Sequence, residues 1–246
     1  TDHLNAIAGD AADSVLTRNK TLPTSAKPSR PSRLRLGSRG RAHFVGVGGA
    51  GMRSLAAVLH EAGWRVTGSD CTAIAPEDFA FPVFSPHARK NVPEGIHYLI
   101  HSDAVQCQNP ELTSAAEKGV PRNSYFQTLG DLMVDRIGVA VAGTHGKSTV
   151  TAMTAWCLVN AGMDPTVVYG AAPLRATHGG RLGHGPFLLV EACEYRRNFL
   201  NLAPRCGVIL GVEPDHFDCF SSQEDLDDAF GEFAEKISES GFLLVR

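Results

Sequence analysis

The sequence lacks the features that would assign the protein to several specialised classes. No apolar run approaches the roughly 18 residues of a membrane-spanning helix, and no apolar signal-peptide core lies near the first residue. The net charge of −3 is too small to indicate a nucleic-acid-binding protein. The six cysteines form no Cys-x-x-Cys pair, so neither a disulfide framework nor a zinc site is predicted. We therefore expect a cytoplasmic protein with no membrane span and no nucleic-acid partner.

The chain does have the length and composition of a globular protein. Its 246 residues are 43% hydrophobic and 20% charged, which suits one large or two smaller domains. Residues 1–40 differ from the rest, because the stretch from Thr21 to Gly40 combines three prolines with Ser, Arg and Lys and offers few core-forming side chains. We predict a disordered basic leader there; a weak contact with a membrane or nucleic acid is the less favoured alternative.

A first glycine-rich turn lies between two predicted strands. The apolar segment His43 to Val47 leads into Gly46-Val47-Gly48-Gly49-Ala50-Gly51, which contains Gly-x-Gly-x-x-Gly. A helix is predicted over Met52 to Ala62, and a second strand over Trp64 to Gly68 ends at Ser69-Asp70. This order is typical of dinucleotide-binding proteins, in which a diphosphate approaches the backbone and an acid accepts a sugar hydroxyl. A glycine-rich turn without a ligand remains the alternative.

A second glycine-rich turn has the pattern of a phosphate-binding loop. Gly143-Thr144-His145-Gly146-Lys147-Ser148-Thr149 follows the apolar run Ile137 to Ala142 and precedes a helical pattern over Ser148 to Ala161. The first turn of such a helix leaves backbone N–H groups free for phosphate oxygens, Lys147 can reach the terminal phosphates, and the Ser148 hydroxyl can bind magnesium. Val141 stands where the usual pattern has a further glycine, so a plain strand-to-helix turn remains the alternative.

Strands and helices alternate over most of the remaining chain, which predicts parallel sheets of the α/β class. We predict a Rossmann-like domain over residues 41–134, with Ser102 close to Gly48, and an incomplete P-loop ATPase-type domain over residues 135–246. Gly179 to Pro186 is predicted to be a loop, and Ser221 to Glu224 resembles a helix-capping box. Further strands are predicted over Ile96–His101, Pro165–Tyr169, Phe187–Val190, Gly207–Gly211 and Phe242–Val245, and further helices over Pro110–Lys118 and Tyr125–Val134.

Two side chains are candidates for a magnesium site beside the second glycine turn. Glu191 and His216 each follow a predicted strand on the side of the sheet where Ser148 is expected. Magnesium takes hard oxygen ligands and borrows only one or two from the protein, whereas histidine is a less usual ligand. Glu194 competes with Glu191 for this role. Either residue alone would more often be an ordinary loop or core residue.

Several of these segments, taken together, resemble the Mur ligases over roughly residues 41–246. The segments are His43 to Met52, Gly68-Ser69-Asp70, Ala142 to Thr149, Arg181-Leu182-Gly183-His184-Gly185 and Asp215-His216-Phe217-Asp218. The resemblance implies that ATP binds Gly143 to Thr149 and that the first glycine turn holds a UDP-sugar, although the pattern alone would favour NAD. It implies catalytic roles for Lys147, Glu191 and His216, and Mg²⁺ held by Ser148, Glu191 and His216. The implied UDP-sugar contacts are Gly46, Gly48, Gly49, Ala50, Gly51, Met52, Ser69, Asp70 and Ser102.

The branch of the family that the chain resembles uses ATP to join L-alanine to the lactyl carboxylate of UDP-N-acetylmuramate through an acyl phosphate, in peptidoglycan precursor synthesis. A ligase that recycles UDP-muramoyl peptides, a nucleotide-binding homologue without ligase activity and an NAD-dependent enzyme remain alternatives. The sequence departs from the family pattern at Ser148, at Cys193 and Tyr195 within Ala192-Cys193-Glu194-Tyr195, and at Gly211. The chain ends on a predicted strand, and we expect it to lack the third domain of the family. We therefore expect a fragment that binds its ligands better than it turns them over.

Overall fold

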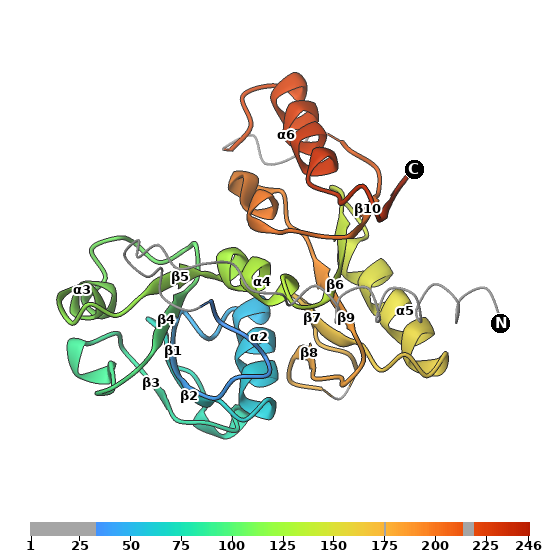
Figure 1. Ribbon diagram of the computed structural model, residues 1–246. Helices are drawn as coiled ribbons and strands as arrows, with labels where there is room; N and C mark the ends of the chain where they lie inside the picture. Colours follow the sequence, from blue (N-terminus) through green and yellow to red (C-terminus); the bar gives the residue numbers. More distant parts are fainter. Residues whose placement is uncertain (1–32, 175, 214–218) are drawn as a thin grey trace, which may run out of the picture. The chain divides into compact units, whose positions relative to one another are not determined.

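The computed structural model describes residues 33–174, 176–213 and 219–246 (Figure 1). The first part of the described chain is a parallel sheet with the strand order β3-β2-β1-β4-β5. Its strands are β1 (Arg41–Val45), β2 (Arg65–Ser69), β3 (Val83–Phe84), β4 (Tyr98–His101) and β5 (Arg122–Ser124). The helices that accompany it are α2 (Ala50–Glu61), α3 (Pro110–Glu117) and α4 (Tyr125–Met133), with short 3₁₀ turns η1 (Pro76–Asp78) and η2 (Arg89–Asn91).

The second part is a six-stranded sheet with the order β11-β10-β6-β9-β7-β8. All of its pairs are parallel except β7 with β8. The strands are β6 (Ile137–Ala142), β7 (Thr166–Tyr169), β8 (Gly179–Arg181), β9 (Phe187–Glu191), β10 (Cys206–Ile209) and β11 (Phe242–Val245). The helices are α5 (Lys147–Asn160) and α6 (Gln223–Glu235), and the 3₁₀ segment η3 (Tyr195–Asn201) follows β9. The predicted α/β class with two mostly parallel sheets is confirmed.

Burial on both faces explains why the central strands of the second sheet contain almost only apolar residues. The sequence of β6 is Ile-Gly-Val-Ala-Val-Ala, and all of its residues except Val139 are buried. In α2, Leu55, Ala56 and Leu59 are fully buried, as their helical spacing predicts. Parallel sheets covered by helices on both faces require such continuous apolar strands.

The structure corrects three of the sequence predictions. The glycine-rich segment predicted as a loop contains β8, and the lack of a side chain at Gly180 lets this strand approach α2 closely. Leu34 and Leu36 belong to the hydrophobic core although the predicted leader extends to residue 40; the rest of that leader, residues 1–32, lies outside the described residues. Helix α6 is capped by Ser222, whose hydroxyl accepts a hydrogen bond from the Asp225 N–H at 3.1 Å, one residue later than predicted.

Strand register places the candidate site residues at the carboxyl edge of each sheet. In the first sheet Val45 pairs with both Ser69 and His101, so the first glycine turn, Asp70 and Ser102 leave the sheet side by side. In the second sheet Val141 pairs with Glu191, next to the start of the second glycine turn. Ligands of open parallel sheets bind at this edge.

Candidate functional site

The turn between β6 and α5 has the geometry of a phosphate-binding loop. Gly143 has a φ of 132° and Gly146 a φ of 81°, values at which residues with a side chain would be strained. A Cβ atom at Gly143 would also lie 2.7 Å from the Leu210 side chain. Helix α5 then begins at Lys147, so its unpaired N–H groups face the turn.

The ammonium group of Lys147 is held inside this turn. Its Nζ atom donates hydrogen bonds to the carbonyl oxygens of Gly143, at 2.6 Å, and Thr144, at 3.1 Å. It also forms an ion pair with Glu194 Oε2 at 2.9 Å, and the Glu194 side chain is only 1% exposed. A buried carboxylate paired in this way keeps the lysine charge directed into the turn, where phosphate oxygens would compete for it.

Ser148 and Glu191 together form an oxygen-rich site beside Lys147. The Ser148 hydroxyl lies 3.0 Å from both carboxylate oxygens of Glu191, and the Gly170 N–H donates to Glu191 Oε2 at 2.9 Å. These hard oxygen donors fit Mg²⁺, which completes its coordination with water and phosphate oxygens. The two acids therefore have different partners, since Glu191 contacts Ser148 whereas Glu194 contacts Lys147.

The other predicted residues of this turn have different environments. Thr144 is buried, and its hydroxyl bonds both the N–H and the carbonyl of Glu213, each at 3.0 Å. His145 and Thr149 are exposed, and His145 lies 3.9 Å from Glu213. His216 lies outside the described residues. Within the described part of the chain, no group of three or more His, Cys, Asp or Glu side chains is arranged to hold a metal.

The first glycine turn is tied to the acid at the end of β2. The Gly48 N–H donates to Asp70 Oδ2 at 2.8 Å, and a Cβ atom at position 48 would lie 2.8 Å from that oxygen. Burial opposes ionisation of Asp70, but hydrogen bonds from Thr72 and Gly48 outweigh it and lower the pKa of the carboxyl group. Asp70 is therefore ionised when it accepts the hydrogen bond from the turn. A side chain at position 48 would have to displace this carboxylate.

A cavity of about 560 Å³ opens beside this turn. Its lining includes Gly46, Gly49, Asp70, His87 and Ser102. The glycine turn and Ser102 are in contact, because a Cβ atom at Gly46 would lie 3.0 Å from Ser102 Cβ. Of the predicted UDP-sugar contacts, Gly46, Gly49, Asp70 and Ser102 thus share one cavity wall.

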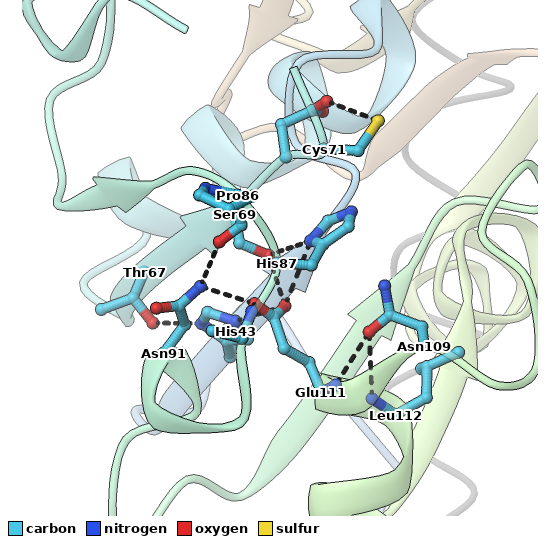
Figure 2. A network of polar contacts seen from close by, with 12 residues as sticks. His43, Thr67, Ser69, Cys71, Pro86, His87, Asn91, Asn109, Glu111 and Leu112 are labelled. Carbon is cyan, nitrogen blue, oxygen red and sulfur yellow. Dashed lines mark hydrogen bonds and ion pairs between the residues drawn. The ribbon is translucent and has the colours of Figure 1, made fainter. Parts of the chain in front are cut away.

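Ser69 is placed differently from these residues. It is fully buried and its hydroxyl donates to Glu111 Oε2, within the polar network shown in Figure 2. Glu111 also accepts hydrogen bonds from Asn91 Nδ2 at 2.7 Å and from the Ala88 N–H at 3.0 Å, and it pairs with His43 Nε2 at 3.3 Å. The Ser69 side chain therefore belongs to this buried network and does not line the cavity.

This network was missed by the sequence prediction. Glu111 is the second residue of α3, where an acid is ordinarily a surface residue interacting with the helix dipole. Asn109 caps the same helix by accepting hydrogen bonds from the N–H groups of Glu111 and Leu112. The only available signal was an acid directly after a capping Asn-Pro pair, which does not reveal a buried network.

A second cavity of about 480 Å³ is lined by residues from both sheets. The first glycine turn contributes Gly49 to Met52, and the second sheet contributes Gly170 and Glu191. Tyr125 closes over the turn, with its hydroxyl oxygen 3.0 Å from the position of a Cβ atom at Gly51. Arg196 also lines this cavity and was not identified from the sequence.

Two glycine turns at the carboxyl edges of two parallel sheets, one of them enclosing a lysine, define a nucleotide-binding α/β protein. Residues 41–136 match the catalytic domain of the Mur ligase family, and residues 141–246 match the Mur ligase middle domain. The chain therefore belongs to the Mur ligase family. Mur ligases are ATP-dependent, amide-bond-forming enzymes of peptidoglycan precursor synthesis, and the middle domain binds ATP.

Curated relatives carry the name UDP-N-acetylmuramate–L-alanine ligase. The chain is 38% identical to that of Geotalea uraniireducens (strain Rf4) over 207 residues, covering 82% of this chain and 45% of the relative. It is 39% identical to that of Nitratidesulfovibrio vulgaris (strain DP4) over 207 residues, with coverages of 82% and 45%. The chain thus spans less than half the length of these relatives.

Two solved structures share the fold. One is a UDP-N-acetylmuramate:L-alanyl-γ-D-glutamyl-meso-diaminopimelate ligase from Neisseria meningitides, with a TM-score of 0.76 and 25% identity over 85% of this chain and 72% of that one. The other is the UDP-N-acetylmuramate–alanine ligase of Thermotoga maritima, with a TM-score of 0.74 and 27% identity over 84% of this chain and 49% of that one. Among the described residues, no helix is long and apolar enough to cross a membrane.

Proposed function

We propose that this chain is the UDP-sugar-binding and ATP-binding part of a ligase that joins L-alanine to UDP-N-acetylmuramate. Residues 41–134 would form the UDP-sugar domain, and residues 135–246 would form part of the ATP domain. The supporting observation is the cavity shared by Gly49 to Met52 and Glu191, because it connects the first glycine turn with the magnesium candidate. The names of the curated relatives support the same substrates.

In the proposed reaction, an oxygen of the lactyl carboxylate attacks the γ-phosphorus of ATP, and ADP leaves. The amine of L-alanine then attacks the carbonyl carbon of the acyl phosphate, an amide bond forms, and phosphate and a proton are released. Lys147 would hold the γ-phosphate by its charge, and the N–H groups at the start of α5 would orient the phosphate chain. Mg²⁺ held by Ser148 and Glu191, with His216 as a further candidate ligand, would neutralise phosphate charge.

Binding and turnover test this proposal separately. By calorimetry the chain should bind UDP-N-acetylmuramate, and Lys147→Ala should weaken ATP binding while leaving the UDP-sugar affinity unchanged. In the full-length protein, phosphate release should require UDP-N-acetylmuramate, L-alanine and Mg²⁺ together and should be lost in Lys147→Ala. Tight NAD binding without any response to UDP-N-acetylmuramate would overturn the substrate assignment.

A ligase that attaches a tripeptide is a second candidate function. Its support is the fold similarity to the Neisseria enzyme, which is named for L-alanyl-γ-D-glutamyl-meso-diaminopimelate. The two functions are distinguished by the amine that triggers phosphate release. If the tripeptide but not L-alanine supports release, the recycling function replaces the first proposal.

A further inference from the structure

Two consecutive arginines after β9 have an uncommon backbone conformation. Arg196 has φ 53° and ψ 29°, and Arg197 has φ 55° and ψ 24°, inside the segment η3. Residues with a side chain rarely adopt this left-handed region, and a pair of them persists only where surrounding contacts hold it. Such outliers concentrate at functional sites, so the contacts that hold this pair are informative.

Arg197 provides much of the anchor. Its guanidinium bonds Asp225 Oδ1 at 2.6 Å and the Asp225 carbonyl at 3.0 Å, and it pairs with Glu232 Oε1 at 2.5 Å. Its N–H donates to the Glu194 carbonyl at 2.8 Å. Arg197 is therefore held by contacts with α6 and with Glu194, the residue that pairs with Lys147.

Arg196 faces the second cavity instead. It is exposed, its guanidinium lies 5.4 Å from the centre of the Tyr195 ring, and Nη1 donates weakly to the Asp103 carbonyl at 3.4 Å. Within the described part of the chain no ion pair joins it to a carboxylate, unlike Arg197. It is the one basic residue among the described residues that line this cavity, whereas Asp103 and Glu191 are acidic.

We propose that Arg196 binds the carboxylate of the UDP-sugar acid and positions it for phosphorylation, an inference that rests on the proposed function. An anionic substrate that enters a cavity lined by two acidic side chains needs a compensating positive charge. The diphosphate is assigned to the first glycine turn, which leaves the carboxylate for the part of the cavity shared with Glu191. A guanidinium binds a carboxylate through two parallel hydrogen bonds, which orients it more firmly than an ammonium would.

The test compares two UDP-sugars that differ at the carboxylate. UDP-N-acetylglucosamine has the same diphosphate as UDP-N-acetylmuramate but lacks the lactyl acid. Asparagine adopts the left-handed conformation more readily than arginine, so Arg196→Asn removes the charge without adding backbone strain. By calorimetry, Arg196→Asn should weaken UDP-N-acetylmuramate binding by roughly tenfold or more and leave UDP-N-acetylglucosamine binding unchanged. Arg196→Lys should give an intermediate loss.

The controls keep this inference separate from the proposed function. Arg122→Ala removes an exposed arginine of β5 and should change neither affinity. Equal weakening of both sugars by Arg196→Asn would overturn the carboxylate assignment, as would unchanged binding of both. If the unmodified chain bound neither sugar, the proposed function itself would be overturned. Thermal melting of Arg196→Asn at or above the temperature of the unmodified chain would confirm that any affinity loss is local.

Discussion

Glu111 is a fully buried carboxylate whose charge is balanced by hydrogen bonds from neighbouring segments of the first sheet. Burial alone would raise its pKa, but hydrogen bonds from His43, Ser69 and Ala88 outweigh burial and lower the pKa to about 2. Because these contacts reach β1, β2 and Ala88 just before η2, this one carboxylate ties together three segments of the first sheet close to the cavity beside the first glycine turn.

The lowered pKa of Glu111 predicts a loss of stability in acid. The unfolded chain, with an ordinary glutamate pKa of 4.5, takes up the proton more readily than the folded chain. The stabilisation is therefore complete above pH 4.5 and is lost as the pH falls from there towards 2. Its full size is about 3 kcal/mol from the shift, of which about 2 kcal/mol is lost by pH 3. Chemical denaturation between pH 7 and pH 3 measures that part.

Substituting Glu111 distinguishes its contribution to the pH dependence of stability from that of the other acids. Glu111→Gln should remove most of this pH dependence and destabilise the chain at pH 7 by about 2–4 kcal/mol, because an amide cannot replace a charged acceptor facing several donors. Glu117→Gln is the control, since Glu117 pairs with Arg89 on the surface and both side chains are more than half exposed. If the two variants had the same acid profile, the assigned role of Glu111 would be wrong.

At the scale of elements, β8 shows why glycine content misled the sequence prediction. Gly179 and Gly180 were interpreted as loop residues, yet both pair with β7. A Cβ atom at Gly180 would lie 2.3 Å from the Ser54 carbonyl oxygen in α2. Gly180 is therefore explained by close packing of the strand against α2, and Gly179 by its close approach to the carbonyl oxygens of Ala171 and Tyr169, not by turn flexibility.

This packing predicts opposite effects for two glycine-to-alanine changes. Gly180→Ala should destabilise the chain by about 1–3 kcal/mol or more, because the neighbour is helix backbone that cannot move aside cheaply. Gly231→Ala in α6 should instead stabilise it by about 0.5–1 kcal/mol, since that site is exposed with nothing within 4 Å. Thermal melting of both variants measures the contrast. A neutral Gly180→Ala would contradict the contact between β8 and α2.

Local patterns revealed the elements but only part of the site. Glycine turns after apolar strands identified the loop containing Lys147 and Ser148 and the turn containing Gly48, because those functions depend on residues adjacent in sequence. Glu191 and Glu194 have different partners because their side chains point in different directions within one short segment. The spacing of apolar residues in the sequence does not reveal these directions. Glu111 and Arg196 escaped prediction because their partners lie far away in sequence or depend on an unusual backbone conformation.

For the whole molecule, the contact between the two sheets passes through α2. This helix packs against β7 and β8 as well as against its own sheet (Figure 1). At the centre of the contact, Ser54 Oγ lies 2.9 Å from two carbonyl oxygens that share its proton, those of Tyr169 in β7 and of Ala50 in its own helix. It also accepts a hydrogen bond from the Gly179 N–H at 3.0 Å. Because α2 begins at the first glycine turn, this hydroxyl couples the UDP-sugar candidate site to the second sheet.

The coupling predicts that the two sheets unfold together and that Ser54 contributes to this cooperativity. Ser54→Ala removes the partner of the buried Gly179 N–H and a hydrogen bond to the Tyr169 carbonyl, and it should cost about 1–3 kcal/mol, lowering the melting temperature by roughly 2–12 °C. Thr113→Ala is the control, because Thr113 makes an exposed bond within its own helix, to the Asn109 carbonyl. Calorimetry should show one transition for the unmodified chain and a broader or split transition for Ser54→Ala. Melting of Ser54→Ala that matched the control would mean that apolar packing of α2, and not its hydroxyl, joins the sheets.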